Sequence, residues 1–363
     1  MKILAAMLVL CFCTMTSLVC EDTKALVLGR YQVKSKQMPA FWRINAEKSR
    51  VICQDGAFSI PLPDQTALWL FGDTFLGTFV GERPEFEGAV SNSVCRVSNI
   101  STQPTAEYLV NAKGRADFVV PLQAPESWEK HRIWPCTGIH IDGSTYLFYE
   151  RIEITGNTMW SFQGVGVGLA IAQGNSWNFQ RVCIPETASE VPIVPQSAVI
   201  YGKDCLLYFL SKIDAYTSAV FLSKVPITSL ADPKAYQFWK GGCDFSSSKA
   251  EAAYLVMDVY GQVSVAYNPY LDQFVMFHVG HPALHPRSIF IRTAKHPFGP
   301  WSEPVLVFSL PGELGKDLVG LFYCAYLHPE LFRENGRVMA ITYCIVDTNP
   351  QNPALVEIEL TPP

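Results

Sequence analysis

Residues 55–77 read DGAFSIPLPDQTALWLFGDTFLG, and this stretch decides the fold class. Two apolar runs, residues 57–62 and residues 67–71, stand on either side of the segment Pro-Asp-Gln-Thr at residues 63–66. Short apolar runs separated by Pro, Asp and Gly are typical of strands joined by a tight turn. The stretch therefore predicts an antiparallel β-hairpin.

Similar apolar runs recur along the chain at intervals of about 60 to 80 residues, and helical periodicity is almost absent. The runs occupy residues 67–71, 145–149, 206–210, 274–277 and 338–342. In three places a second apolar segment follows and leads to a tryptophan, namely Trp177, Trp239 and Trp301. A degenerate repeat of ~40–60 residues with several strands in each unit is typical of β-propeller blades.

The repeat predicts an all-β chain folded as a five-bladed β-propeller. We expect blades near residues 50–110, 130–186, 190–245, 255–310 and 318–360, with the segment before residue 50 pairing with the other terminus to close the ring. No low-complexity linker separates the repeats, so residues 21–363 are expected to form a single domain. A two-sheet β-sandwich is the alternative architecture. In a propeller, polar residues flanking the innermost strands can converge on one mouth of the central channel.

The composition narrows the class of partner. Hydrophobic residues make up 49% of the chain and charged residues 17%, which excludes a disordered chain and predicts an extensive core. The net charge is -5 and the basic residues are scattered, so neither nucleic acid nor an anionic membrane is an expected partner. The glycine-rich segment at residues 164–168 lacks the following helix of a phosphate-binding loop, and no cofactor is expected.

The N-terminus is typical of an export signal. Lys2 precedes an apolar run at residues 3–13, which is too short to cross a bilayer as a mature helix. We expect residues 1–20 to be a signal peptide and the protein to be secreted, periplasmic or at the cell surface. Cys20 is a possible site of lipid attachment, although Val19 stands where a small residue is preferred.

The cysteines permit disulfides, with buried free thiols as the alternative, and they argue against a metal site. Of the 11 cysteines, three lie in the first 20 residues, and the remaining eight are an even number in a chain expected to be exported. Their wide spacing contains no Cys-x-x-Cys, which argues against zinc. His278, His281 and His285 lie close together but do not alternate along a strand, so no metal ligand is predicted among them.

Asp55 and Asp73 are the leading candidates for chemistry. Asp55 precedes the first strand of the predicted hairpin and Asp73 follows the second, so antiparallel pairing should place them side by side at one end. A carboxylate pair at about 5–5.5 Å serves retaining glycoside hydrolysis, and a pair at about 6.5–9.5 Å serves inversion. The alternative is ordinary turn chemistry, in which each carboxylate accepts backbone N–H bonds.

The hairpin resembles that of a group of five-bladed propellers that includes the bacterial endo-D-arabinanases of glycoside hydrolase family 183. The resemblance spans about residues 50–345 and rests on residues 55–62 and 68–77, Ser91-Asn92-Ser93, Trp134-Pro135, residues 263–269, Thr293-Ala294 and residues 299–302. It implies that Asp55 and Asp73 are the catalytic pair and that cleavage of furanosidic linkages in a polysaccharide proceeds with retention. The sequence does not assign the two roles, and Asp55 is the favoured nucleophile.

Two departures from the pattern leave the substrate open. Gln262 stands where many relatives carry an acidic residue, and Cys136 follows Trp134-Pro135 where a glycine or small polar residue is more usual. A non-catalytic propeller that binds glycan or protein at its channel mouth is therefore the alternative function.

Five further residues are candidates for substrate binding. Asn92 could hydrogen-bond a sugar hydroxyl or cap a turn, and Trp134 could stack on a sugar or belong to the core. Glu150, followed by Arg151, is expected to end an inner strand and is the third acid should the aspartates prove structural. Gln262 and His328, in the His-Pro-Glu segment of the last predicted blade, complete the set.

Overall fold

The structure is a computed structural model that describes residues 30–362, except residues 82, 159, 175, 183–193, 215–216, 311–321 and 346–351. The predicted signal peptide and Cys20 lie outside the described residues. The fold is all-β: the one α-helix of the described part is α1 (Arg43–Lys48), and none of its helices could span a membrane. Short 3-10 turns are η2 (Ile227–Ser229), η3 (Pro233–Ala235), η4 (Lys249–Glu251), η5 (Pro329–Leu331) and η6 (Glu334–Gly336).

The predicted hairpin is present. Strands β3 (Phe58–Pro61) and β4 (Ala67–Phe71) pair antiparallel, with Phe58 opposite Leu70. The turn is closed by the Leu62 N–H, which donates to the Thr66 carbonyl over 2.9 Å. Strands β7 (Ser93–Ser98) and β8 (Thr105–Tyr108) extend the sheet in the order β3-β4-β7-β8.

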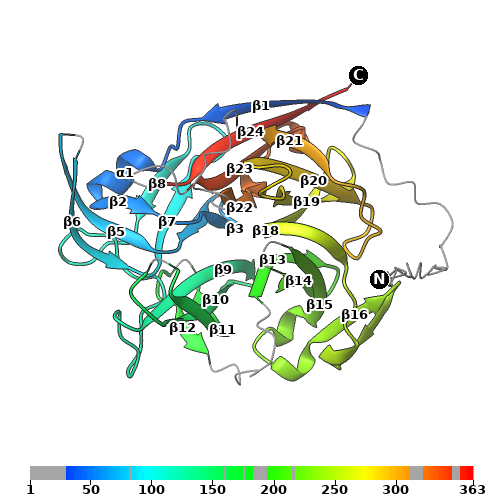
Figure 1. Cartoon of the computed structure of the whole chain (residues 1–363), viewed down its shortest axis with the longest axis horizontal. Helices are drawn as coiled ribbons and strands as arrows, with labels where there is room; N and C mark the ends of the chain where they lie inside the picture. The colour runs from blue at the N-terminus through cyan, green and yellow to red at the C-terminus, as the bar shows by residue number, and fades with distance from the viewer. Residues whose placement is uncertain are drawn as a thin grey trace, which may run out of the picture.

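A second, three-stranded sheet grows from the same hairpin. Strand β2 (Val51–Gln54) precedes β3 and pairs with β5 (Thr74–Val80), which follows β4 and pairs in turn with β6 (Arg83–Val90). Figure 1 shows β5 and β6 projecting away from the centre of the molecule. The chain thus bends from one sheet into another at two facing corners, residues 55–57 and residues 72–73.

The middle of the chain forms two further sheets. One is β12-β11-β10-β9, made of β9 (His131–Ile141), β10 (Ser144–Ile154), β11 (Phe162–Gln173) and β12 (Gln180–Val182). The other has nine strands: β13 (Val194–Tyr201), β14 (Asp204–Lys212), β15 (Ser218–Pro226), β16 (Gln237–Gly241), β17 (Asp244–Ser246), β18 (Val256–Asn268), β19 (Gln273–Val279), β20 (Ser288–Ala294) and β21 (Val305–Ser309). Pairing of β15 with β18 joins the third and fourth expected repeats into this one sheet.

The two ends of the chain share the last sheet. Its order is β1-β24-β23-β22, with β1 (Gln32–Met38), β22 (Phe322–Leu327), β23 (Val338–Ile345) and β24 (Ala354–Thr361). Gln32 lies opposite Thr361 and Met38 opposite Leu355, so the predicted pairing of the two termini is present.

The first strand of each repeat lies innermost. Figure 1 shows β3, β9, β13, β18 and β22 nearest the centre, with contacts between successive members of this set. The apolar runs recognised in the sequence are the second strands: β4, β10, β14, β19 and β23. Glu150 is therefore in the middle of a second strand, not at the end of an inner strand as expected.

Packing between neighbouring sheets forms the core. Ile60 on β3 and Leu147 on β10 are fully buried in one cluster, and Phe277 on β19 and Ile341 on β23 in another. Burial of each such side chain contributes about 1.5–3 kcal/mol. A core arranged around the centre holds the inner strands at fixed distances, and these strands carry the pocket described next.

Candidate functional site

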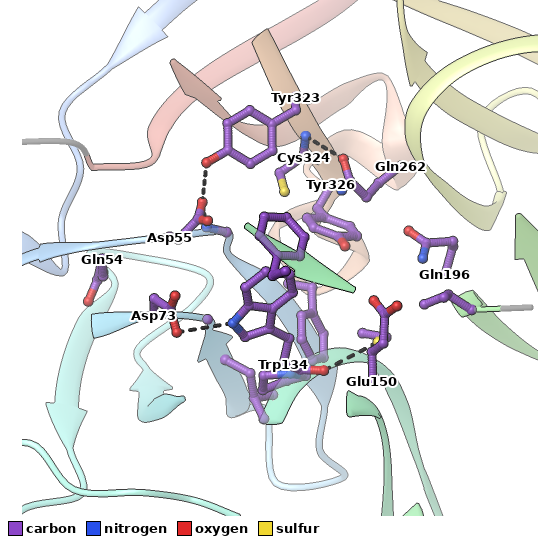
Figure 2. A pocket seen from close by; sticks show the side chains of 18 of the residues that line it. Gln54, Asp55, Asp73, Trp134, Glu150, Gln196, Gln262, Tyr323, Cys324 and Tyr326 are labelled. Atoms are coloured by element: carbon purple, nitrogen blue, oxygen red, sulfur yellow. Dashed lines mark hydrogen bonds between the residues drawn. The ribbon is translucent and has the colours of Figure 1, made fainter. Parts of the chain in front are cut away.

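The inner strands surround a pocket of about 550 Å³. Its lining includes five of the predicted site residues: Trp134, Glu150 and Gln262 on three different strands, and Asp55 and Asp73 at the two corners of the hairpin. Figure 2 shows Asp55 and Asp73 on one wall and Glu150 and Gln196 on the opposite wall, with Trp134 between them. The pocket therefore brings together most of the polar candidates drawn from distant parts of the sequence.

Irregularities in the inner strands turn side chains into this pocket. Register shifts leave Cys136 on β9 and Gln196 on β13 without a cross-strand partner, and the same holds for Gln262 on β18 and Cys324 on β22. All four line the pocket, and Asp55 lies at the equivalent break between β2 and β3. A β-bulge re-aims one side chain without ending its strand, so each inner strand presents a residue at a similar level.

The hairpin places the backbones of the two aspartates together. The Asp55 N–H donates to the Asp73 carbonyl over 3.0 Å, and the Gly72 N–H donates to the Asp55 carbonyl over 2.7 Å. A Cβ atom at residue 72 would lie 3.5 Å from the Asp55 carbonyl oxygen, an ordinary contact. The neighbouring arrangement expected from antiparallel pairing is thus present in the backbone, and both side chains line the same pocket.

Asp55 is held by donors from three directions. Its Oδ1 accepts from the Tyr323 hydroxyl at 2.5 Å and from the Gly56 N–H at 2.7 Å. The Cys344 thiol also hydrogen-bonds the carboxyl. Burial raises the pKa of Asp55, while these three hydrogen bonds act in the opposite direction because they favour the charged carboxylate.

Asp73 has a different set of partners. Its Oδ1 accepts from the Trp134 Nε1–H at 3.0 Å, and the Arg132 Nε lies 3.7 Å away. Burial raises the pKa of Asp73 to about 6, against the Trp134 hydrogen bond and the Arg132 charge, with Asp55 adding to the rise. Trp134 therefore orients a carboxyl group as well as lining the pocket.

Glu150 faces the pocket from β10. Among the described residues, no side chain or backbone N–H donates a hydrogen bond to its carboxyl group, and burial raises its pKa to about 7. The side chain lies over β11, where a Cβ atom at Gly164 would stand 2.2 Å from Glu150 Oε1. At Gly168 a Cβ would likewise meet the ring of Tyr149 at 2.2 Å. These two glycines of the 164–168 segment make room for the side chains of the neighbouring strand.

Two glutamines that the sequence did not single out also line the pocket. Gln54 is 2% exposed and Gln196 is 7% exposed. The Tyr108 hydroxyl donates to Gln54 Oε1 at 3.0 Å, but Gln54 Nε2 and Gln196 Oε1 have no partner among the described atoms. A buried polar atom without a partner costs about 1–3 kcal/mol. No sequence pattern distinguishes these two glutamines from others. The bulge at Gln196 and the corner after Gln54 bring them to the pocket.

Gln262 and the aromatic candidates form other parts of the wall. Gln262 Oε1 accepts from the backbone N–H of Cys324 at 2.9 Å, so this amide also holds the neighbouring inner strand. Trp134 packs edge to face on Phe162 at 5.0 Å. Trp160 lines the pocket and is 62% exposed, and it was not predicted.

Asn92 and His328 lie outside the pocket lining. Asn92 is fully buried, accepts from the Val119 and Val120 N–H groups and donates to the Ile133 carbonyl. It therefore joins a loop to the inner strand β9 instead of facing a sugar. The chemistry expected of Ser-Asn-Ser is satisfied within the protein.

His328 is also enclosed by the protein. Its ring stacks on Trp69 at 4.0 Å, and its two nitrogens lie 2.9 Å from the hydroxyls of Ser59 and Thr342. Its side chain is fully buried. His328, a candidate for substrate binding, instead joins strands β3 and β23 through Ser59 and Thr342.

One group among the described residues has the donors for a metal ion. Asp55, Cys324 and Cys344 place one carboxylate oxygen and two Sγ atoms within 4.8 Å of one another. The histidines considered earlier do not contribute: His278 is buried, its Nδ1 lies 2.8 Å from the Val279 carbonyl, and its pKa is lowered to about 4 by desolvation. The seven cysteines described are unpaired, so the predicted disulfides are not present in this structure.

Solved structures show the same fold in other proteins. A Bacteroides ovatus protein provisionally assigned as a hydrolase aligns with a TM-score of 0.67 at 16% identity, over 90% of each chain. A Dyadobacter fermentans protein of unknown function aligns with a TM-score of 0.52 at 10% identity, over 91% of this chain and 99% of that one. A GH43_1 enzyme from Xanthomonas citri, solved with xylotriose, aligns with a TM-score of 0.50 at 11% identity, over 92% and 91%. At these identities the likeness is one of fold.

The sequence itself matches one family. No curated protein matches the chain. The family described as "Domain of unknown function (DUF4185)" matches residues 45–348, a stretch that contains both aspartates and every inner strand of the pocket. The chain therefore belongs to the DUF4185 family.

Proposed function

We propose that the protein is a glycoside hydrolase that cleaves a polysaccharide with the carboxyl pair Asp55 and Asp73. One observation carries the proposal: two adjacent carboxyl groups with unlike hydrogen-bond partners share a pocket with a third, Glu150. Glycoside hydrolysis needs one carboxyl group to be charged and another to carry a proton at the working pH. Neighbouring carboxyls in unlike surroundings supply this difference.

The surroundings suggest a role for each aspartate. Burial raises the pKa of Asp55, and the three hydrogen bonds that it accepts oppose this rise by favouring the charged form that a nucleophile requires. Asp73, with a pKa raised to about 6, can protonate the leaving oxygen and later accept a proton from water. This assignment corresponds to a retaining reaction, as the resemblance to glycoside hydrolase family 183 implies, and arabinofuranosidic linkages are the first substrates to test.

The rest of the pocket suits a polyhydroxylated ligand. Gln54 and Gln196 offer one unpartnered donor and one unpartnered acceptor, and Trp134 and Trp160 offer apolar ring surface. The fold shared with an enzyme solved with xylotriose supports a sugar ligand in this position. We place Trp134, Glu150, Gln196 and Gln262 among the groups that contact the substrate.

The proposal includes the architecture and the location. We interpret the strand groups as five blades of a single domain, in which the β15–β18 pairing joins two blades without merging them. We also propose export through residues 1–20, because a polysaccharide substrate would be met outside the cytoplasm.

The test is turnover of a panel of arabinans and mixed glycans by the purified chain. Asp55→Asn and Asp73→Asn should each lower turnover at least about 1000-fold, since each removes a group used in the transition state. Asp64→Asn is the matched control, because Asp64 lies in the turn at the opposite end of the same hairpin, where it accepts hydrogen bonds from Thr66. Anomeric NMR of the first product should show retention.

Each outcome has a separate meaning. Turnover unchanged in both aspartate variants would refute the carboxyl pair. Turnover abolished by Glu150→Gln, with an inverted product, would assign the acid to Glu150 instead. Glycan binding that survives Asp73→Asn, with no product released by any variant, would favour the non-catalytic binding propeller.

A further inference from the structure

The strongest unused feature of the molecule is a pair of buried thiols behind Asp55. Cys324 lies on β22 and Cys344 on β23, neighbouring strands of the sheet that closes the ring. Their Sγ atoms and a carboxylate oxygen of Asp55 all lie within 4.8 Å of one another. Cys324 lines the pocket, whereas Cys344 is fully buried behind it.

The three groups form a chain of hydrogen bonds that ends on the carboxylate. The Cys324 thiol hydrogen-bonds Cys344, and the Cys344 thiol hydrogen-bonds Asp55. The Gly56 N–H donates to Asp55 Oδ1 at 2.7 Å and also hydrogen-bonds the Cys344 sulfur. The state of the sulfur atoms is thereby linked to the charge on Asp55.

The backbone at this point is already irregular. Cys324 is the first residue of the bulge in β22 and has a φ of 57°, in the left-handed region. Its N–H is held by the Gln262 side chain at 2.9 Å. Strain of this kind persists where the surrounding structure enforces it, and a bulge can adjust more readily than a regular strand pair.

We propose that Cys324 and Cys344 are an oxidisable pair that forms a disulfide and thereby withdraws the thiol donor from Asp55. The consequence for catalysis rests on the role proposed above for Asp55. The oxidant is a dissolved disulfide. The thiolate of Cys324, the pocket-facing residue, attacks one sulfur of the oxidant and releases the first thiol.

The thiolate of Cys344 then attacks the Cys324 sulfur of the mixed disulfide, which forms the intramolecular bond and releases the second thiol. The two cysteines lose two protons and two electrons, and the oxidant gains both. Because burial raises the pKa of both thiols, the exchange should be slow and should speed up as the pH rises.

The test oxidises the full chain with glutathione disulfide and counts thiols after unfolding. In a Cys243→Ser background, which removes an exposed thiol that would form a mixed disulfide, we expect two fewer reactive thiols and a mass lower by two hydrogens. Peptide mapping should join the segments that carry residues 324 and 344. Cys324→Ser and Cys344→Ser should abolish this change, and each should take up at most a mixed disulfide.

Cys136→Ser is the matched control. Cys136 is a buried thiol at the equivalent bulge of another inner strand and lines the same pocket. Its loss should leave the two-hydrogen oxidation intact. Should Cys344→Ser fail to fold, the wild-type thiol count and Cys324→Ser still decide the question.

The catalytic arm measures turnover before and after oxidation. Loss of one hydrogen bond to a carboxylate should lower turnover at neutral pH by about 10-fold. Reduction with dithiothreitol should restore it. An unchanged thiol count would overturn the proposal, as would a zinc ion found by native mass spectrometry at Asp55, Cys324 and Cys344. A disulfide in a protein that hydrolyses no glycan would instead retain the pair and refute the proposed function.

Discussion

Glu150 allows a stability measurement that needs no substrate. Its pKa is raised from 4.5 to about 7 by burial, so between these values the unfolded chain is ionised while the folded protein keeps its proton. The stability contributed by the protonated group is complete below pH 4.5 and is lost as the pH rises through about 7. At about 1.4 kcal/mol for each pH unit, the loss amounts to about 3 kcal/mol. Glu150→Gln removes the titration while keeping the shape of the side chain.

The assay is urea unfolding of the wild type and Glu150→Gln at about pH 5 and about pH 8, with equal m-values required for the comparison. Any change in unfolding free energy that the Gln side chain itself causes is the same at both pH values, so it cancels in the comparison. Between about pH 5 and about pH 8 the variant should gain about 2.5 kcal/mol of unfolding free energy relative to the wild type, because part of the loss has already occurred at pH 5. Glu153→Gln, on the same strand with its carboxylate bonded to Gln163, is the control and should show no such gain. A wild-type-to-variant difference that stays constant with pH would refute the reasoning.

Two other predictions concern the neighbouring strands. Trp134→Phe removes the Nε1–H donor from Asp73, so the pKa of Asp73 should rise above about 6, by about one pH unit; carbon-13 NMR titration of labelled aspartate would detect the change, and an unaltered titration would contradict it. Gly138→Ala should lower the unfolding free energy by about 1–3 kcal/mol, because its Cβ would stand 2.2 Å from Ile60 Cδ1 between two inner strands. Urea unfolding measures this loss, and Ile60→Val should recover part of it if the contact is the cause.

The sequence predicted the structure well where local signals were strong, as in one hairpin. The hairpin of β3 and β4 was expected because its turn carries Pro, Asp and Thr between two apolar runs, and the structure has it. The apolar runs were identified as strands but not as second strands. The apolar character of these runs reflects burial between two sheets. Burial alone does not determine which strand lies nearest the centre.

The site was predicted in part: residues placed by local strand pairing were found, and residues placed by long-range contacts were missed. Asp55 and Asp73 are joined by a short hairpin, so their proximity follows from local pairing. Gln196 and Tyr323 reach the pocket through a bulge and a closing sheet, and these depend on contacts far apart in the sequence. Asn92 was a candidate because a polar residue between serines suits a ligand. In the structure its amide is hydrogen-bonded to buried backbone groups instead.

The pairing of β1 with β24 makes completion of the last sheet depend on two segments at opposite ends of the described chain. The Thr361 hydroxyl donates to the Gln32 carbonyl across a sequence separation of 329 residues. Contacts of such long range form late in folding, because closing a very large loop costs chain entropy. Until β24 has been synthesised, β1 and β23 lack the strand that pairs with both of them. A nascent chain therefore leaves this sheet incomplete, and the sheet closes only when β24 pairs with both β1 and β23.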